Sequence, residues 1–217
     1  MPALLDRRAV TVDLEGTDPP DMRIPPGRSD ETGSVPRCVR SCDSIGPVVA
    51  NQLVLQAALG RTSGTVTNFL EQLVGEGIDA YASQHEPIGV QGANELQVQE
   101  GEQVLYRAAT LRGHISGRSY VYAQSVIVLS RLPTRFGRRL ETSIDPIGRI
   151  LDEMGIDVTR QDFVEAEESV VSRLWNLDVS VGDCLLTRRY RIDSDQSPLM
   201  VITEWFLPTL TPFLALA

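Results

Sequence analysis

The sequence predicts an α+β fold in which two helices precede a mainly antiparallel sheet. Runs of β-branched and aromatic residues with period-two alternation suggest two hairpins, over residues 103–129 and 185–207. Segments with helical start and stop signals precede the first hairpin and separate it from the second. A chain of 217 residues, 42% of them hydrophobic, is long enough to bury one sizeable core.

The first 44 residues differ in composition from the rest of the chain. Residues 1–44 are rich in Pro, Gly, Asp and Arg and show no sustained periodicity, so we expect an irregular N-terminal arm. Residues 45–217 are expected to form one domain. Its first element is a helix over residues 47–59, with a proline in the first turn and Gly60 after its end.

A second helix is expected to end near residue 73, with Thr65 or Thr67 as its cap. The free backbone amides at such a start suit an anion, although most capped helix starts bind only their own cap. Two short strands, over residues 78–85 and 88–90, are predicted to follow around a turn.

The first hairpin places a charged residue on an apolar face. Its strands are predicted over residues 103–111 and 118–129, around a tight turn at 113–117. Alternation puts Arg107 on the same face as Leu105 and Ala109, so its guanidinium interrupts an otherwise apolar surface.

The segment between the hairpins is predicted to hold a helix pair and an edge strand. The helices are expected over residues 134–140 and 145–154, the second with Asp145 as N-cap and Pro146 at its first position. Arg135, Arg138 and Arg139 suggest an exposed helix face. An edge strand is expected over 158–169, and residues 170–183 are a short helix or a long loop.

The last predicted strand, over residues 199–208, carries a second charged anomaly. Both of its faces are apolar, which predicts a central, covered strand, yet Glu204 shares a face with Met200 and Ile202. Burying a carboxylate is costly unless it is protonated, paired or hydrogen-bonded. Glu204 is therefore either half of a structural ion pair with an arginine or a site carboxylate with a tuned pKa.

Composition excludes several classes of function. The net charge of −9 and the absence of a basic run disfavour a nucleic-acid partner. All 20 basic residues are Arg, which excludes chemistry that needs a lysine Schiff base or a P-loop lysine. The same bias indicates a GC-rich genome. No apolar run suits a membrane, and the first residues lack signal-peptide order, so we expect a cytoplasmic protein. Cys38, Cys42 and Cys184 are expected to be thiols, without a zinc site.

Seven segments between about residues 48 and 208 carry a resemblance to a known family. They are Gly64-Thr65-Val66-Thr67, Leu105-Tyr106-Arg107, Tyr122-Ala123-Gln124-Ser125, Arg131-Leu132-Pro133, Pro146-Ile147-Gly148, Arg189-Tyr190-Arg191 and Ile202-Thr203-Glu204-Trp205-Phe206-Leu207-Pro208. In this order and spacing they resemble the bacterial chorismate pyruvate-lyases that form 4-hydroxybenzoate. The resemblance implies a curved, mainly antiparallel sheet with helices on one side and an occluded cavity between them.

The resemblance also implies a site. Its residues would be Thr65, Val66, Thr67, Arg107, Ile147 and Glu204. Arg107 would hold the ring carboxylate together with the backbone amides at the helix start, and Ile147 would pack on the ring. Glu204 would face the hydroxyl at the opposite end and assist proton transfer, so Arg107 and Glu204 are the expected catalytic residues. No metal, nucleotide or redox cofactor would be required. Tyr106 and Tyr122 could narrow the pocket, whereas Trp205 should face away from it.

Three functions are compatible with these features. The first is a lyase that releases pyruvate from chorismate and leaves 4-hydroxybenzoate. The second is an enzyme of the same fold in secondary metabolism, catalysing a cyclisation or elimination on another substrate. The third is a non-catalytic small-molecule sensor, disfavoured because such regulators carry a winged-helix domain where this chain has its Pro-rich arm. The expected partner is a small carboxylate, bound by a monomer or homodimer without nucleic acid or membrane.

Overall fold

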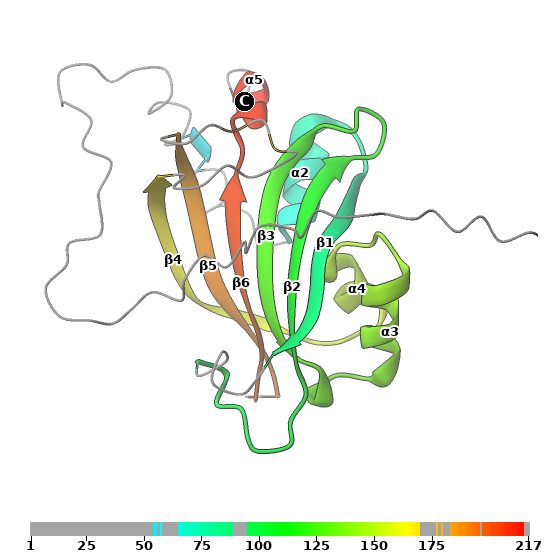
Figure 1. Ribbon diagram of the computed structural model, residues 1–217. Helices are drawn as coiled ribbons and strands as arrows, with labels where there is room; N and C mark the ends of the chain where they lie inside the picture. The colour runs from blue at the N-terminus through cyan, green and yellow to red at the C-terminus, as the bar shows by residue number, and fades with distance from the viewer. Residues whose placement is uncertain are drawn as a thin grey trace, which may run out of the picture. The chain divides into compact units, whose positions relative to one another are not determined.

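The computed structural model describes residues 54–55, 57, 65–88, 95–169, 177, 179, 183–195 and 197–214. A six-stranded antiparallel sheet dominates these residues, in the order β1-β2-β3-β6-β5-β4 (Figure 1). Its strands are β1 (Ile78–Ile88), β2 (Val104–Gly113), β3 (Ser119–Val128), β4 (Thr159–Ser169), β5 (Cys184–Ser194) and β6 (Ser197–Phe206). The predicted α+β class is confirmed.

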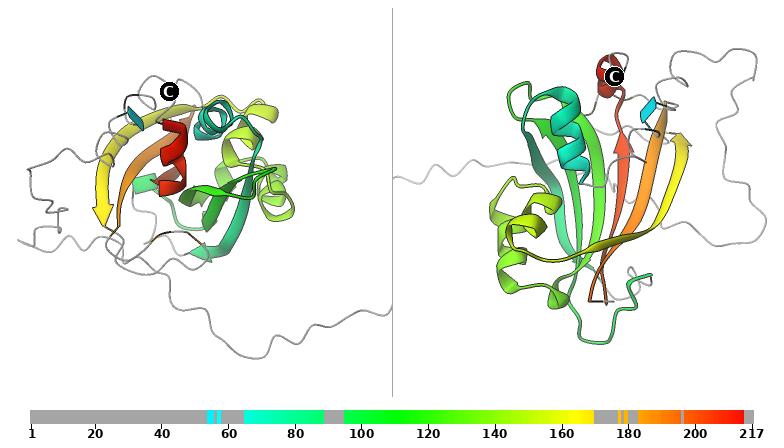
Figure 2. Two further views of the ribbon diagram at one scale, coloured as in Figure 1. Left: turned by 90° about the horizontal axis from the view of Figure 1, so that it is seen from above. Right: turned by 180° about the vertical axis from the view of Figure 1, so that it is seen from behind.

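Short helices accompany the sheet. They are α2 (Val66–Val74), α3 (Thr134–Thr142), α4 (Ile147–Glu153) and α5 (Thr211–Leu214), with 3-10 turns η2 (Leu129–Arg131) and η3 (Pro208–Leu210). Figure 2 shows the sheet curving around its inner side. There Phe69 of α2 packs in one core cluster with Leu111 of β2 and Phe206 of β6, and Ile150 of α4 packs in a second with Ile202.

Both predicted hairpins are confirmed, as is the edge position of β4. The turn of the first hairpin closes where the Gly117 amide donates to the Gly113 carbonyl, at 2.9 Å. β6 lies between β3 and β5, and both its faces are covered, because Met200 and Ile202 are buried on the inner side and Val201 and Trp205 on the outer side.

Some local predictions are wrong. The expected turn near residue 86 is absent from β1, which is one strand with an irregularity between Ala82 and Gln84, because pairing with β2 continues through Pro87 to Ile88. Asp145 is not the N-cap of α4. Pro146 occupies that position without a side-chain cap bond, and the Asp145 carboxylate instead accepts a hydrogen bond from Arg139 Nε at 2.9 Å.

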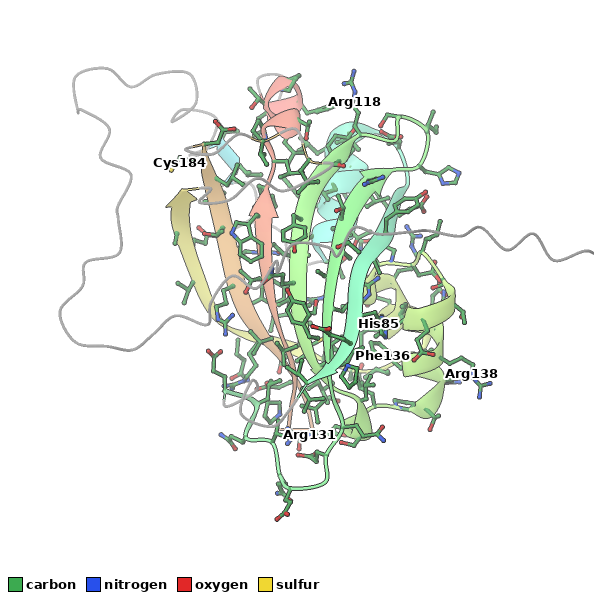
Figure 3. All side chains as sticks on the ribbon, viewed as in Figure 1. His85, Arg118, Arg131, Phe136, Arg138 and Cys184 are labelled. Atoms are coloured by element: carbon green, nitrogen blue, oxygen red, sulfur yellow. The ribbon has the colours of Figure 1, made fainter. Side chains whose placement is uncertain are left out.

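The predicted exposed face of α3 is confirmed for Arg135 and Arg138, which are exposed, but not for Arg139. Arg138 is exposed and points away from the helix pair in Figure 3. Arg139 is part-buried and forms two ion pairs, in which its Nη2 lies 2.8 Å from Asp145 Oδ2 and 2.5 Å from Glu153 Oε2. None of the described helices is long and apolar enough to cross a membrane.

Several expectations fall on residues outside the described ranges. These are the arm over residues 1–44, the helix over 47–59 except for helical Val54, Leu55 and Ala57, strand residues 89–90, and most of 170–183. Cys184 is disulfide-bonded, so the expectation of a thiol is wrong at this position. That expectation depended on the assumed compartment and not on chain geometry. Cys38 and Cys42 are not among the described residues.

Candidate functional site

A cavity lies between the inner face of the sheet and the starts of α2 and α4. All six residues predicted for the site line it: Thr65, Val66, Thr67, Arg107, Ile147 and Glu204. They come from four segments that are far apart in the sequence, namely the start of α2, strand β2, the start of α4 and strand β6. The fold therefore brings the predicted residues together around one space.

Small side chains on the central strands create this space. Ala109 of β2 and Ala123 of β3 are paired neighbours, and the next row on the same face holds Ser125. All three line the cavity. Larger inward residues at these positions would fill the volume above the sheet, as Leu111 and Ile202 do at the cavity's borders. The sequence prediction did not include these small residues in the site, although it placed Ala109 on the same face as Arg107.

Arg107 presents a buried cation to the cavity. Its side chain is on the inner face and the residue is only 3% exposed. Within the described residues, its Nε and Nη2 atoms have no hydrogen-bond partner. Burial lowers the pKa of Arg107 to about 10, which still leaves it charged at neutral pH. A buried guanidinium with free donors is unfavourable alone and is well suited to an anionic ligand.

The start of α2 adds backbone donors to the same cavity. Thr65 is the N-cap, and its Oγ1 accepts a hydrogen bond from the Asn68 amide at 3.1 Å. This confirms Thr65, not Thr67, as the cap. Val66 and Thr67 are buried in the first turn, where helix amides have no partner within the helix and where the dipole favours negative charge.

Gly148 allows α4 to approach this helix start closely. A Cβ atom on Gly148 would lie 2.5 Å from Thr65 Cγ2 and 2.8 Å from Thr65 Cβ. Such distances are shorter than real Cβ contacts, so glycine is required for the observed packing. The neighbouring Ile147 is 8% exposed and lines the cavity, with its side chain in the core cluster that contains Ile202.

Glu204 is paired, but not with Arg107. Its Oε2 lies 3.1 Å from Arg188 Nη2 and 3.2 Å from Arg188 Nε, and the Tyr190 hydroxyl donates to its Oε1 at 2.9 Å. Burial raises the pKa of Glu204, while the charge of Arg188 and the hydrogen bond from Tyr190 act in the opposite direction. Glu204 is thus both half of a buried ion pair and a lining residue, so the two sequence interpretations are compatible.

Arg107 and Glu204 are separated diagonally across the cavity floor. The paired row that contains Arg107 continues through Ser125 to Ile202, so Glu204 is two strands and two residues away. Typical strand spacing and rise place their Cα atoms about 12 Å apart.

Sequence reasoning missed Tyr190 and Arg160 as cavity residues and Arg188 as the partner of Glu204. Tyr190 was part of a recognised segment, and alternation along β5 places Arg188, Tyr190 and Ile192 on one face. The expectation that Tyr106 and Tyr122 narrow the pocket is not supported, because both lie in the outer cluster with Trp205. The rings of Tyr122 and Trp205 are 5.6 Å apart between centroids, and Trp205 faces away from the cavity as predicted.

Comparisons with known proteins agree on a family. A family described as chorismate pyruvate-lyase Rv2949c-like matches residues 61–214. A chorismate pyruvate-lyase of Mycobacterium leprae (strain TN) is 30% identical over 152 residues, which cover 67% of this chain and 70% of that protein. One of Mycobacterium tuberculosis (strain CDC 1551 / Oshkosh) is 30% identical over 114 residues, so the chain spans about half of that relative, 53% of its length.

Solved structures support the fold. Gene product SA0254 from Staphylococcus aureus has a TM-score of 0.51 at 10% identity, covering 67% of this chain and 88% of that one. PhnF from Mycobacterium smegmatis also has a TM-score of 0.51, at 11% identity, covering 69% of this chain and 66% of that one. At these identities the likeness concerns the fold alone. The match over residues 61–214 shows the family: this chain belongs to the Rv2949c-like chorismate pyruvate-lyase family.

Proposed function

We propose that this chain is a lyase that eliminates pyruvate from chorismate and forms 4-hydroxybenzoate. The observation that carries the proposal is the arrangement of the cavity. It is lined by a buried guanidinium with two nitrogens that have no partner among the described residues, by a helix start, and by a carboxylate that accepts a hydrogen bond from a tyrosine hydroxyl. This pattern fits a ring with a carboxylate at C1 and a hydroxyl at C4. Family membership supports the same reaction.

In the proposed complex, each predicted residue has one role. Arg107 and the amides of Val66 and Thr67 bind the ring carboxylate through charge-assisted hydrogen bonds. Ile147 packs against the ring. Glu204 accepts a hydrogen bond from the C4 hydroxyl and assists removal of the C4 proton.

The reaction needs no external oxidant or reductant. The C3–O bond breaks and the C4 proton leaves, so the electron pair of the C4–H bond completes the aromatic ring. The departing enolpyruvyl group takes up one proton and becomes pyruvate. Because aromatisation drives the reaction, the protein mainly has to hold one reactive conformer in a water-poor cavity. We therefore propose that the enzyme works without a cofactor.

Tyr190 fits a supporting role next to Glu204. Burial is the main cause that raises the pKa of Tyr190, so its hydroxyl keeps its proton at neutral pH and donates to Glu204 Oε1. With Arg188 on Oε2, this contact fixes the carboxylate orientation. A fixed carboxylate is what proton transfer to or from a bound ring requires.

The test is to mix purified protein with chorismate, follow pyruvate by a coupled lactate dehydrogenase assay, and identify the aromatic product by chromatography. Equal amounts of pyruvate and 4-hydroxybenzoate are expected. Arg107→Gln should weaken 4-hydroxybenzoate binding by about 2–5 kcal/mol, the range for removing one partner of a buried charged contact. Folded protein that binds 4-hydroxybenzoate without turning over chorismate would refute the lyase and favour another substrate or a sensor role.

Cytoplasmic location, a role in secondary metabolism and a monomeric or homodimeric state remain predictions from the sequence. Gel filtration with light scattering measures the last of these directly.

A further inference from the structure

The charges around the cavity do not cancel. Glu204 and Arg188 form a buried pair and offset one another. Two other arginines, Arg107 and Arg160, line the cavity. Among the described residues, no carboxylate within salt-bridge distance neutralises either of them. A protein with a net charge of −9 thus keeps two uncompensated cations around one internal space.

Arg160 reaches the cavity from a different wall than Arg107. The chain leaves α4, turns at Gly155 and enters β4, which crosses to the far edge of the sheet (Figure 2). Arg160 is the second residue of β4 and is paired with Ile192 of β5, which also lines the cavity. Paired residues share a face, so this register directs both side chains inward.

Arg160 lies on the side of the cavity that holds Glu204 and Tyr190. Burial raises the pKa of the Glu204 carboxyl and of the Tyr190 hydroxyl, and the nearby charge of Arg160 acts in the opposite direction on both groups. The Arg160 residue is partly exposed, whereas Arg107 is 3% exposed. The two cations therefore differ in place, with Arg107 deep at one end and Arg160 near the rim at the other.

We propose that Arg160 binds a second carboxylate of the ligand, so that the cavity selects a dianion with its two carboxylates at different ends. This inference rests on the proposed function and deepens it. Chorismate carries a ring carboxylate and a carboxylate on the enolpyruvyl ether at C3, next to C4. The product 4-hydroxybenzoate retains only the first. Arg160 is then a specificity-determining residue that favours substrate over aromatic product.

Two stable aromatic acids separate the second carboxylate from the rest of the ligand. 3-(Carboxymethoxy)benzoate has a ring carboxylate and an ether-linked carboxylate at the ring position that carries the enolpyruvyl ether in chorismate, whereas 3-methoxybenzoate has the ether and the ring carboxylate only. Titration calorimetry of the wild type should show tighter binding of the dicarboxylate. Arg160→Gln should weaken binding of the dicarboxylate by about tenfold to a hundredfold, the range for a hydrogen bond to a charged group. It should leave the affinity for 3-methoxybenzoate within about twofold of the wild-type value.

The matched control is Arg138→Gln. Arg138 is exposed on α3 and points away from the helix pair, so this variant makes the same change in net charge at a distance from the cavity (Figure 3). It should alter neither affinity. Thermal denaturation of each variant checks that the fold is retained, and Arg160→Met offers a second uncharged side chain if Arg160→Gln fails to fold.

Two results would overturn the inference. Unchanged dicarboxylate affinity in Arg160→Gln would show that Arg160 does not contact the second carboxylate. An equal loss of affinity for both acids in Arg160→Gln would show that Arg160 acts only through Glu204. Because binding is measured without turnover, the two proposals can fail separately. A wild type that prefers the dicarboxylate but releases no pyruvate from chorismate would refute the lyase and retain the dianion site.

Discussion

Replacing Gly148 with alanine tests the link between α4 and the start of α2. The added methyl group would lie 2.5 Å from Thr65 Cγ2, well inside van der Waals contact. Thr65 cannot simply rotate away, because its Oγ1 caps α2 through the Asn68 amide. The strain therefore falls on the cap or on the spacing of the two helices, and both changes move the amides that line the cavity.

The expected loss of stability follows from three contributions. Overpacking a filled site costs about 1–3 kcal/mol. Losing the threonine cap adds about 0.5–2 kcal/mol if Thr65 turns. Alanine regains up to about 1 kcal/mol because it is a better helix former than glycine. The net expectation for Gly148→Ala is a loss of about 0.5–4 kcal/mol, or about 1–16 °C in the unfolding midpoint for a domain of this size.

Urea unfolding of a double-mutant cycle provides the assay. Thr65→Ser removes Cγ2 and keeps the capping hydroxyl, so it should cost little alone and should reduce the penalty of Gly148→Ala. The affinity for 4-hydroxybenzoate should fall in Gly148→Ala and recover partly in the double variant. If Gly148→Ala is as stable as the wild type, or if Thr65→Ser leaves its penalty unchanged, the argument from close approach is wrong.

Three further predictions concern single side chains. Glu204→Gln should abolish turnover and lower stability by about 3–5 kcal/mol, because Arg188 is left as an unpaired buried charge; normal activity per folded molecule would contradict the first part. Hydrogen bonds lower the pKa of Glu76 to about 2 from its ordinary 4.5, and the largest contribution comes from the Ser116 hydroxyl. Because its pKa is lowered in the folded state, the Glu76 carboxylate stabilises the fold above pH about 4.5, and this stabilisation is lost as the pH falls towards 2. Glu76→Gln should therefore flatten the pH dependence of urea unfolding between these two pH values. Ala123→Leu should fill the cavity floor and block 4-hydroxybenzoate binding in calorimetry, and unchanged affinity would place the ligand elsewhere.

The sequence was sufficient to find Arg107 and Glu204 because strand alternation is a local property. Each charge interrupts an apolar face with period two, and that face is inward in the structure. The cap of α2 could be narrowed to Thr65 or Thr67 from the sequence, because a capping Oγ1 bonds an amide only a few residues away, as Thr65 does with Asn68.

The partner of Glu204 was not predictable from the sequence. Arg188, Arg189 and Arg191 lie close together, and which of them meets Glu204 depends on the register of β5 against β6. Arg189 faces the other way and lies 2.6 Å from Glu95. Asp145 was misassigned for a similar reason, since a nearby arginine competes with the helix amides for its carboxylate. Such choices depend on tertiary contacts that local patterns do not encode.

The place of β6 in the sheet has a consequence for synthesis of the protein. β3 and β5 are joined only through β6, which leaves the ribosome after all the other strands. Until then, β1–β3 and β4–β5 are separate partial sheets, each with an open edge of unpaired amides and carbonyls. Such edges are prone to pair with other chains. The ligand cavity also cannot exist earlier, because Glu204 arrives on the strand that closes the gap.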